Sequence, residues 1–185
     1  MLRLDFRSAA DAFIAGHKAS GWTWQEPPSV PAMGYMARSR LHTRRGEDAD
    51  DATDGDDDAT ASTPAETLTC RQYIVYSSTF QVPAFYFTLH DASGAPLPLD
   101  DLVRTTLFHR FAFEGTESTT FGVSLPGSAF PLLSQGDHPT LGTPCWYFHP
   151  CESAAAVTEI MAELGDERRG WLETWFMVLG TVVNM

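Results

Sequence analysis

The sequence predicts an α+β domain in which helices pack against an antiparallel sheet. Three observations favour this class: apolar residues recur at helical spacing near the start, β-branched and aromatic residues fill two runs in the middle, and helical spacing returns after residue 153. Strands that are followed by helices, without regular alternation, are typical of α+β folds. With 185 residues, of which 43% are apolar, the chain can bury a core without disulfides or metals, so we expect one domain over residues 1–185.

The chain is expected to open with an amphipathic helix. Ser8 and Asp11 have the spacing of a capping box, and Gly21 ends the helical pattern. Residues 22–31 contain two tryptophans and three prolines, which favour an ordered connection without regular structure. The positions that define the helical spacing are Phe6, Ala10, Phe13, Ile14 and His17.

Four stretches are predicted as strands. Residues 33–40 form the first, and the runs 69–77 and 82–90 form two central strands because they are rich in β-branched and aromatic residues. Residues 145–148 are a short apolar run that suits a last buried strand, since Pro150 then interrupts it.

Three further helices are expected after the central strands. The pattern of residues 99–107 suits one short helix, a second helix runs from Ser153 to Gly165, and a third includes Trp171 and Leu179. Residues 119–133 fit neither periodicity and stay unassigned.

The net charge of −12 comes mainly from one segment. Nine of the 24 acidic residues lie in it without any Lys or Arg, and removing them leaves 15 acidic against 12 basic residues. A segment with so few apolar residues cannot bury enough surface to order itself, so we expect a disordered loop over residues 45–67. The rest of the chain is nearly neutral, and we expect no nucleic-acid partner.

The cysteine count and the apolar runs indicate the compartment. Three cysteines cannot all pair within the chain, and the start lacks the apolar region of a signal peptide, so free thiols and a cytoplasmic location are expected. The longest apolar stretch, 175–183, is far shorter than the roughly 18 residues of a membrane span.

Cys151 differs from the other cysteines because it directly precedes an alanine-rich helix. Cys70, at the start of a strand, and Cys145, in an apolar run, are predicted to be packing residues. At a helix start, the backbone N–H groups and the helix dipole favour a thiolate. From these residues alone, Cys151 is either a reactive or a structural thiol.

Two other chemistries fit the residues of this segment less well. Cys145, His149 and Cys151, with His138 upstream, are potential zinc ligands, but their spacing matches no common zinc pattern, so we expect no metal. A Cys-His hydrolase needs a base within hydrogen-bond reach of Cys151, and the sequence places none of the other histidines there.

Three short motifs surround Cys151: Gln135-Gly136-Asp137-His138-Pro139, Gly142-Thr143-Pro144 and His149-Pro150-Cys151-Glu152-Ser153. Together they resemble the active-site region of the autophagy-related protein 10 family, which are ubiquitin-like conjugating enzymes. Residues 73–77 and 81–87 are similar to that family's central strands, and residues 171–183 to its closing helix. The resemblance implies a ubiquitin-conjugating-enzyme-like fold.

The resemblance also implies a function that needs no cofactor. An activating enzyme, autophagy-related protein 7, would hand the C-terminal glycine of the ubiquitin-like autophagy-related protein 12 to Cys151 as a thioester. The chain would then transfer it to a lysine of autophagy-related protein 5. Both acyl transfers pass through a tetrahedral oxyanion, so the site needs a thiolate and an oxyanion stabiliser.

Two residues beside Cys151 are candidates for supporting roles. Ordinary ubiquitin-conjugating enzymes, which resemble this family in fold, place an asparagine ahead of the cysteine and near the oxyanion. The only asparagine here is Asn184, at the end of the sequence, so the oxyanion donor is either a backbone N–H group at the helix start or the hydroxyl of Ser153. Ser153 is alternatively the helix N-cap. His149 either orients the loop or tunes the thiolate, although we expect its ring to point away from Cys151.

Two other functions remain open at this point. The related autophagy-related protein 3 family shares His-Pro-Cys but transfers its modifier to a lipid amine. That family has a longer chain, with a large acidic insertion and a helical handle before the active site. The acidic segment of this chain, residues 45–67, is short and leaves no room for such a handle, which disfavours that assignment here. The other possibility is a non-catalytic interaction module in which Cys151 is incidental.

Overall fold

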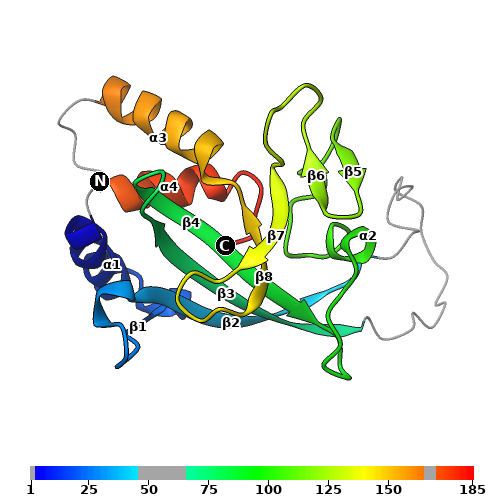
Figure 1. The fold of residues 1–185 in the computed structure, drawn as a ribbon, viewed down its shortest axis with the longest axis horizontal. Coiled ribbons are helices and arrows are strands. Elements are labelled where there is room, and N and C mark those ends of the chain that lie inside the picture. Colours follow the sequence, from blue (N-terminus) through cyan, green and yellow to red (C-terminus); the bar gives the residue numbers. More distant parts are fainter. Residues whose placement is uncertain (1–2, 46–65, 165–169) are drawn as a thin grey trace, which may run out of the picture.

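Eight strands form one antiparallel sheet in the order β1-β2-β3-β4-β8-β7-β6-β5 (Figure 1). The computed structural model describes residues 3–45, 66–164 and 170–185. The strands are β1 Thr23–Gln25, β2 Tyr35–Thr43, β3 Thr67–Ser77, β4 Val82–His90, β5 Glu117–Thr119, β6 Gly122–Ser124, β7 Leu133–Asp137 and β8 Pro144–Phe148. The helices are α1 Arg3–Gly16, α2 Leu99–Leu102, α3 Pro150–Leu164 and α4 Trp171–Leu179, with 3-10 turns at Lys18–Ser20 and Pro31–Met33. This α+β fold is consistent with a ubiquitin-conjugating-enzyme-like domain, as expected.

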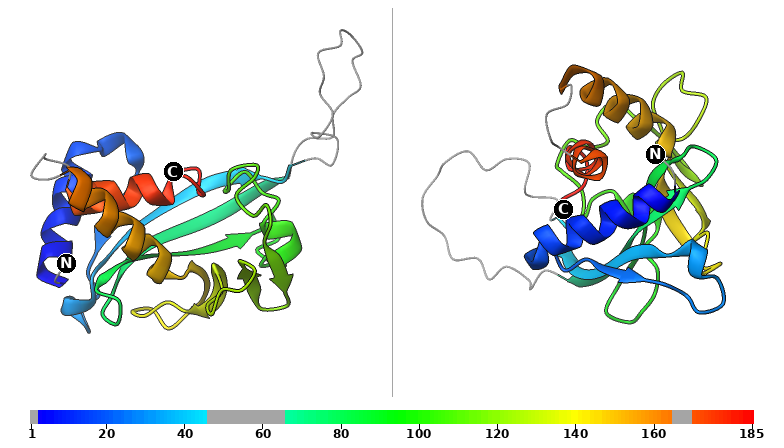
Figure 2. Two further views of the ribbon diagram at one scale, coloured as in Figure 1. Left: turned by 90° about the horizontal axis from the view of Figure 1, so that it is seen from above. Right: turned by 90° about the vertical axis from the view of Figure 1, so that its left-hand side faces the viewer.

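The helices α1, α3 and α4 cover one face of the sheet (Figure 2). Because side chains alternate along a strand, β3 turns Cys70, Ile74 and Tyr76 towards these helices. From the helix side, the ring of Phe6 in α1 lies 5.9 Å from that of Tyr76, and Trp175 of α4 is fully buried. The main apolar core therefore lies between the sheet and the three helices.

The opposite face carries a row of tyrosines. Tyr73, Tyr86 and Tyr147 are direct cross-strand partners on β3, β4 and β8, so their side chains share this face. The loop between β7 and β8 covers the row with His138, whose side chain is completely buried. The hydroxyl of Thr140 in this loop donates to the backbone oxygen of Met33 at 2.9 Å, which ties the loop to the segment before β2.

The first helix differs from its prediction at both ends. It begins at Arg3, so Ser8 lies inside the helix and does not cap it. The predicted capping partner, Asp11, instead forms an ion pair with Arg7 one turn earlier, at 2.8 Å. The helix ends at Gly16, and Gly21, with φ of 75°, ends the separate 3-10 turn that follows.

Three connections also differ from the predictions. Residues 23–25, expected to be irregular, form the edge strand β1, which pairs with the start of β2. The helix expected over 99–107 ends at Leu102, because Thr106 exchanges hydrogen bonds with Thr43 at the end of β2. The unassigned stretch 119–133 contains β6 and the ends of β5 and β7.

The other predicted elements form close to their expected positions. Strand β4 has its predicted bounds, and β3 and β8 begin two residues and one residue early. The strand expected over 33–40 is displaced to Tyr35–Thr43, since the extended β3 offers it pairing partners as far as Thr67. Most of the loop expected over 45–67 lies outside the described residues, but Thr67 already belongs to β3.

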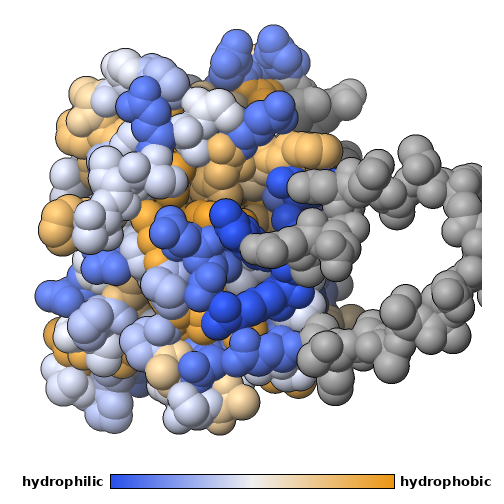
Figure 3. Space-filling model, turned by 90° about the vertical axis from the view of Figure 1, so that its right-hand side faces the viewer, coloured by the Kyte–Doolittle hydropathy of each residue, from blue (hydrophilic) through white to orange (hydrophobic). Residues whose placement is uncertain are grey.

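In the described part of the chain, no helix combines the length and apolar character that crossing a bilayer requires. The end of the molecule that carries β5, β6 and α2 presents hydrophobic and hydrophilic side chains next to one another (Figure 3).

Candidate active site

Cys151 lies in the first turn of α3, directly after the strand that enters the middle of the sheet. Strand β8 pairs with β4 on one side and with β7 on the other, and this pairing fixes the position of its C-terminal end. The backbone N–H of His149 then donates to the oxygen of Leu132 at 3.0 Å. Pro150 begins the helix, where its missing N–H costs nothing, and is itself buried. The sequence predicted that this helix begins at Ser153, but it begins three residues earlier, at Pro150.

The imidazole of His149 faces the thiol of Cys151. The Nδ1 atom lies 2.8 Å from Sγ, and the backbone N–H of Cys151 donates to the same Nδ1 at 3.4 Å. Both contacts are satisfied when Nδ1 carries the lone pair and Nε2 the proton. The expectation that this ring points away from the cysteine is therefore wrong: the chain turns into the helix at Pro150 and brings the two side chains together.

Two phenylalanine rings enclose the imidazole of His149. Phe130, in the loop between β6 and β7, stacks on it with 4.8 Å between ring centroids and 11° between planes. Phe80, in the turn between β3 and β4, meets it edge-on at 5.0 Å and 76°. Neither residue was predictable from the motif, because both lie in connections that are remote from it in the sequence.

Ser153 is the fourth residue of α3, so the prediction that it caps the helix is wrong. Its hydroxyl donates to the backbone oxygen of Pro150 at 3.1 Å, within the first turn. The only asparagine, Asn184, is engaged elsewhere: its side-chain amide donates to the backbone oxygens of Thr106 and Phe108 at 2.7 and 3.1 Å. Backbone N–H groups in the first turn of a helix have no partner within the helix, and in α3 the N–H of Cys151 donates instead to His149 Nδ1.

The other two cysteines are packing residues, as predicted. Cys70 is fully buried, and burial raises the pKa of its thiol to about 12. Burial also raises the pKa of the Cys145 thiol. Cys151, by contrast, is partly exposed. No three His, Cys, Asp or Glu side chains of the described residues are grouped as metal ligands.

Two hollows border His149. The first, of about 320 Å³, extends from residues 77–80 past Tyr147 to Pro139 and Pro150, and its lining includes no charged side chain. The second, of about 260 Å³, lies between the sheet, α3 and α4, and reaches Ser153 and Trp175. The imidazole of His149 therefore stands at the edge of an uncharged cleft, the first of these two hollows.

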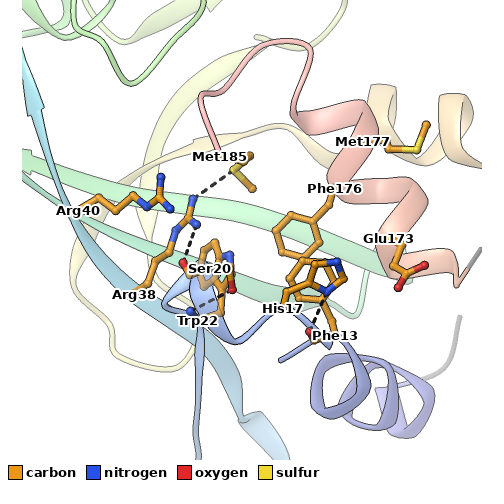
Figure 4. A pocket seen from close by; sticks show the side chains of 10 residues that line it. All are labelled: Phe13, His17, Ser20, Trp22, Arg38, Arg40, Glu173, Phe176, Met177 and Met185. Carbon is orange, nitrogen blue, oxygen red and sulfur yellow. Dashed lines mark hydrogen bonds between the residues drawn. The ribbon is translucent and has the colours of Figure 1, made fainter. Parts of the chain in front are cut away.

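A larger hollow, of about 510 Å³, lies between α1, β2 and α4 (Figure 4). Arg38 occupies one wall of it and contacts Ser20 and Met185, while Phe176 of α4 forms another. None of its lining residues belongs to the site around Cys151.

The sequence of the chain is similar to known proteins. The family model described as "Autophagocytosis associated protein, active-site domain" matches residues 5–185. The human protein named "Ubiquitin-like-conjugating enzyme ATG10" is 22% identical over 202 residues, which covers 97% of this chain and 87% of the human protein.

Two proteins of the same name from other organisms match part of the chain. The Dictyostelium discoideum protein is 26% identical over 60% of this chain and 49% of its own length. The Arabidopsis thaliana protein is 27% identical over 61% of this chain and 48% of its own length. With the family model matching almost the whole chain, the chain belongs to the family of the autophagocytosis-associated protein active-site domain and is a ubiquitin-like-conjugating enzyme.

Proposed function

We propose that Cys151 accepts the C-terminal glycine of the ubiquitin-like autophagy-related protein 12 as a thioester. The activating enzyme, autophagy-related protein 7, supplies this acyl group, and a lysine of autophagy-related protein 5 receives it. The observation that carries the proposal is the 2.8 Å contact between Cys151 Sγ and His149 Nδ1. Among the three cysteines, Cys151 alone is partly exposed.

The chemistry of the first transfer follows from this contact. The thiol proton moves to Nδ1 of His149, and the Cys151 sulfur attacks the thioester carbonyl that the activating enzyme presents. The bond between the carbonyl carbon and the activating enzyme's sulfur breaks, and the departing thiolate takes the proton from Nδ1 of His149. In the second transfer, the acceptor amine attacks the new thioester, Cys151 leaves as the thiolate, and the proton that the amine loses passes to Nδ1 of His149.

The oxyanion of both transfers is proposed to accept hydrogen bonds from the N–H groups in the first turn of α3. The N–H of Cys151 donates to His149 Nδ1, so the groups after it in the turn would serve, and the positive end of the helix dipole favours negative charge there. Ser153 supports them indirectly, since its hydroxyl is bonded to the oxygen of Pro150 and fixes the shape of the turn.

The uncharged cleft beside His149 is proposed to hold the extended tail of the modifier. The cleft is lined by apolar residues and by several hydroxyl-bearing ones, among them Ser77, Tyr86 and Tyr147, which suits a peptide that carries backbone donors and acceptors but little charge. The function requires a reducing compartment to keep Cys151 free, so we assign the protein to the cytoplasm. We treat residues 1–185 as one conjugating domain.

The test uses the purified chain with the activating enzyme, ATP and the ubiquitin-like modifier, analysed on gels with and without reductant. The wild type is expected to form an adduct that reductant removes, and Cys151→Ser one that reductant leaves intact, because an oxyester replaces the thioester. Cys145→Ala, which removes a buried thiol, serves as the matched control and should still form the labile adduct. If the wild type forms no adduct although the activating enzyme is shown to be charged, the non-catalytic interaction module becomes the better assignment.

The acceptor is tested in a second step. Adding autophagy-related protein 5 to the charged enzyme should discharge the thioester and produce an isopeptide-linked product. Discharge to vesicles that contain phosphatidylethanolamine, in place of this protein, would instead favour the lipid-transferring alternative.

A further inference from the structure

The imidazole of His149 is held by residues that come from two separate connections. Phe80 belongs to the turn between β3 and β4, and Phe130 to the loop between β6 and β7. Their ring centroids lie 5.0 and 4.8 Å from that of the imidazole, one edge-on and one stacked. Both arrangements are among the favourable geometries of aromatic pairs. The imidazole thus has an aromatic contact from each loop.

Neither phenylalanine is explained by core packing. Phe80 is 38% exposed and Phe130 is 55% exposed, whereas most of the large apolar side chains that the structure describes on the sheet are buried. The imidazole ring is the contact that these two rings share. A histidine needs such contacts to keep one orientation, because its ring torsion has a broad energy profile.

The backbone around both phenylalanines is locally fixed. The N–H of Phe80 donates to the hydroxyl of Ser77 at 3.4 Å, and Ser128 both accepts from the N–H of Phe130 and donates to its oxygen. Gln81, next to Phe80, has φ of 55° and is the one non-glycine residue in the described part of the chain with a positive φ. Such strained conformations persist where the surrounding structure imposes them, and they concentrate at functional sites.

We propose that Phe80 and Phe130 are positioning residues that hold Nδ1 of His149 against Sγ of Cys151. They act on the reaction only through the imidazole: with the rings in place, the thiol proton has an acceptor at 2.8 Å, and without them the imidazole samples other orientations. This inference rests on the proposed roles of Cys151 and His149.

The test measures the rate at which iodoacetamide alkylates Cys151, followed by mass spectrometry between pH 6 and pH 9. This assay needs no partner protein, and the burial of Cys70 and Cys145 keeps those thiols out of the signal. Phe130→Ala and Phe80→Ala are expected to slow alkylation at pH 7 by about two- to tenfold and to move the rise in rate to higher pH. A merely steric role would give the opposite sign, since removing a ring exposes the thiol.

A double-mutant cycle with His149→Ala decides whether the rings act through the imidazole. In that background, Phe130→Ala should cause no further slowing, because there is no imidazole left to position. Phe130→Tyr, which keeps the ring, should retain the wild-type rate. Phe121→Ala is the matched control, since Phe121 is 74% exposed and lies in the turn between β5 and β6.

Three results would overturn the inference: wild-type alkylation in both single variants, slowing that adds fully to that of His149→Ala, or equal slowing in Phe121→Ala. Thermal unfolding of each variant identifies loss of fold. The proposed function fails separately, because it predicts an adduct with the modifier, whereas the alkylation profile measures only the thiol and its imidazole.

Discussion

The Nδ1 atom of His149 lies 2.8 Å from the Sγ atom of Cys151, with only Pro150 between the two residues in the sequence. A thiol becomes a good nucleophile when a base accepts its proton, and in the proposed mechanism that base belongs to the same short motif. The proposal therefore draws both the nucleophile and its proton acceptor from one motif, which requires that the chain turn into a helix at Pro150. The start of α3 at that residue meets this condition.

Replacement of His149 by alanine should slow thioester formation without abolishing it. General base catalysis typically contributes at least 10²-fold, so we expect a loss of about 10²-fold in the single-turnover rate at pH 7. Quenched-flow mixing with charged activating enzyme measures this rate. An unchanged rate in a variant of unchanged stability would remove His149 from the mechanism.

Replacement of Ser153 by alanine should affect stability more than chemistry. Its hydroxyl bonds to the oxygen of Pro150 at 3.1 Å, and such a hydrogen bond contributes about 1 kcal/mol. We expect urea unfolding to show a loss of this size and the charging rate to fall by less than about threefold, with Ser153→Thr close to wild type on both measures. A loss of 10²-fold in rate would instead identify the hydroxyl as an oxyanion donor.

His138 makes the stability of the fold depend on pH. Burial lowers the pKa of its imidazole to about 4, while Nδ1 accepts the N–H groups of Thr140 and Leu141 at 3.2 Å each. The unfolded chain takes up this proton near pH 6.5, but the folded chain only near pH 4. Stability is therefore complete above about pH 6.5 and falls as the pH decreases towards 4, by up to about 3 kcal/mol.

The variant His138→Asn tests this dependence because its side chain does not titrate. Urea unfolding at several pH values between 7 and 4 should give a stability difference between wild type and variant that shrinks as the pH falls. Other groups titrate in the same range in both proteins, so only the difference reports on His138. A difference that stays constant with pH would show that the imidazole is not the source.

The strands that the sequence predicted well are those with strong local signals. Strand β4 has its predicted bounds because nine consecutive residues are mostly apolar or aromatic and buried between two neighbours. Strand β1 was missed because three residues carry too little pattern, and its pairing with Tyr35 depends on where the chain returns. The capping role of Ser8 was wrong because residues 3–7 continue the helix, which sequence spacing alone does not reveal.

The candidate site was predictable only in part. Cys151 stood out because a motif and a helix start coincide there, and the exclusion of Asn184 needed only a residue count. The orientation of His149 depends on the exact residue at which α3 begins, which is the least predictable property of a helix. Phe80 and Phe130 join the site through the sheet topology, which brings two distant connections to the end of β8.

Arg38 should be a stability residue whose loss leaves the chemistry intact. It is almost fully buried on β2, and its guanidinium donates to the side-chain oxygen of Gln72 at 2.7 Å. It also donates to the backbone oxygen of Ser20 at 3.0 Å (Figure 4). The same group lies 4.3 Å from the ring centroid of Trp22. Burial, with a smaller effect of Arg40, lowers the pKa of Arg38 to about 10, so the group stays charged at neutral pH.

Lysine cannot replace this arrangement, since an ammonium group lacks the planar fork that bonds Gln72 and Ser20 while stacking on Trp22. We expect Arg38→Lys to lower the free energy of unfolding by about 2 kcal/mol, because buried acceptors lose their partners. Arg40→Lys, a half-buried neighbour on the same strand, is the matched control and should change it by less than about 0.5 kcal/mol. Urea unfolding measures both variants, and the thioester yield of the folded fraction should stay at the wild-type value in each. Equal stability of the two variants would mean that the fork of Arg38 contributes nothing that an ammonium cannot supply.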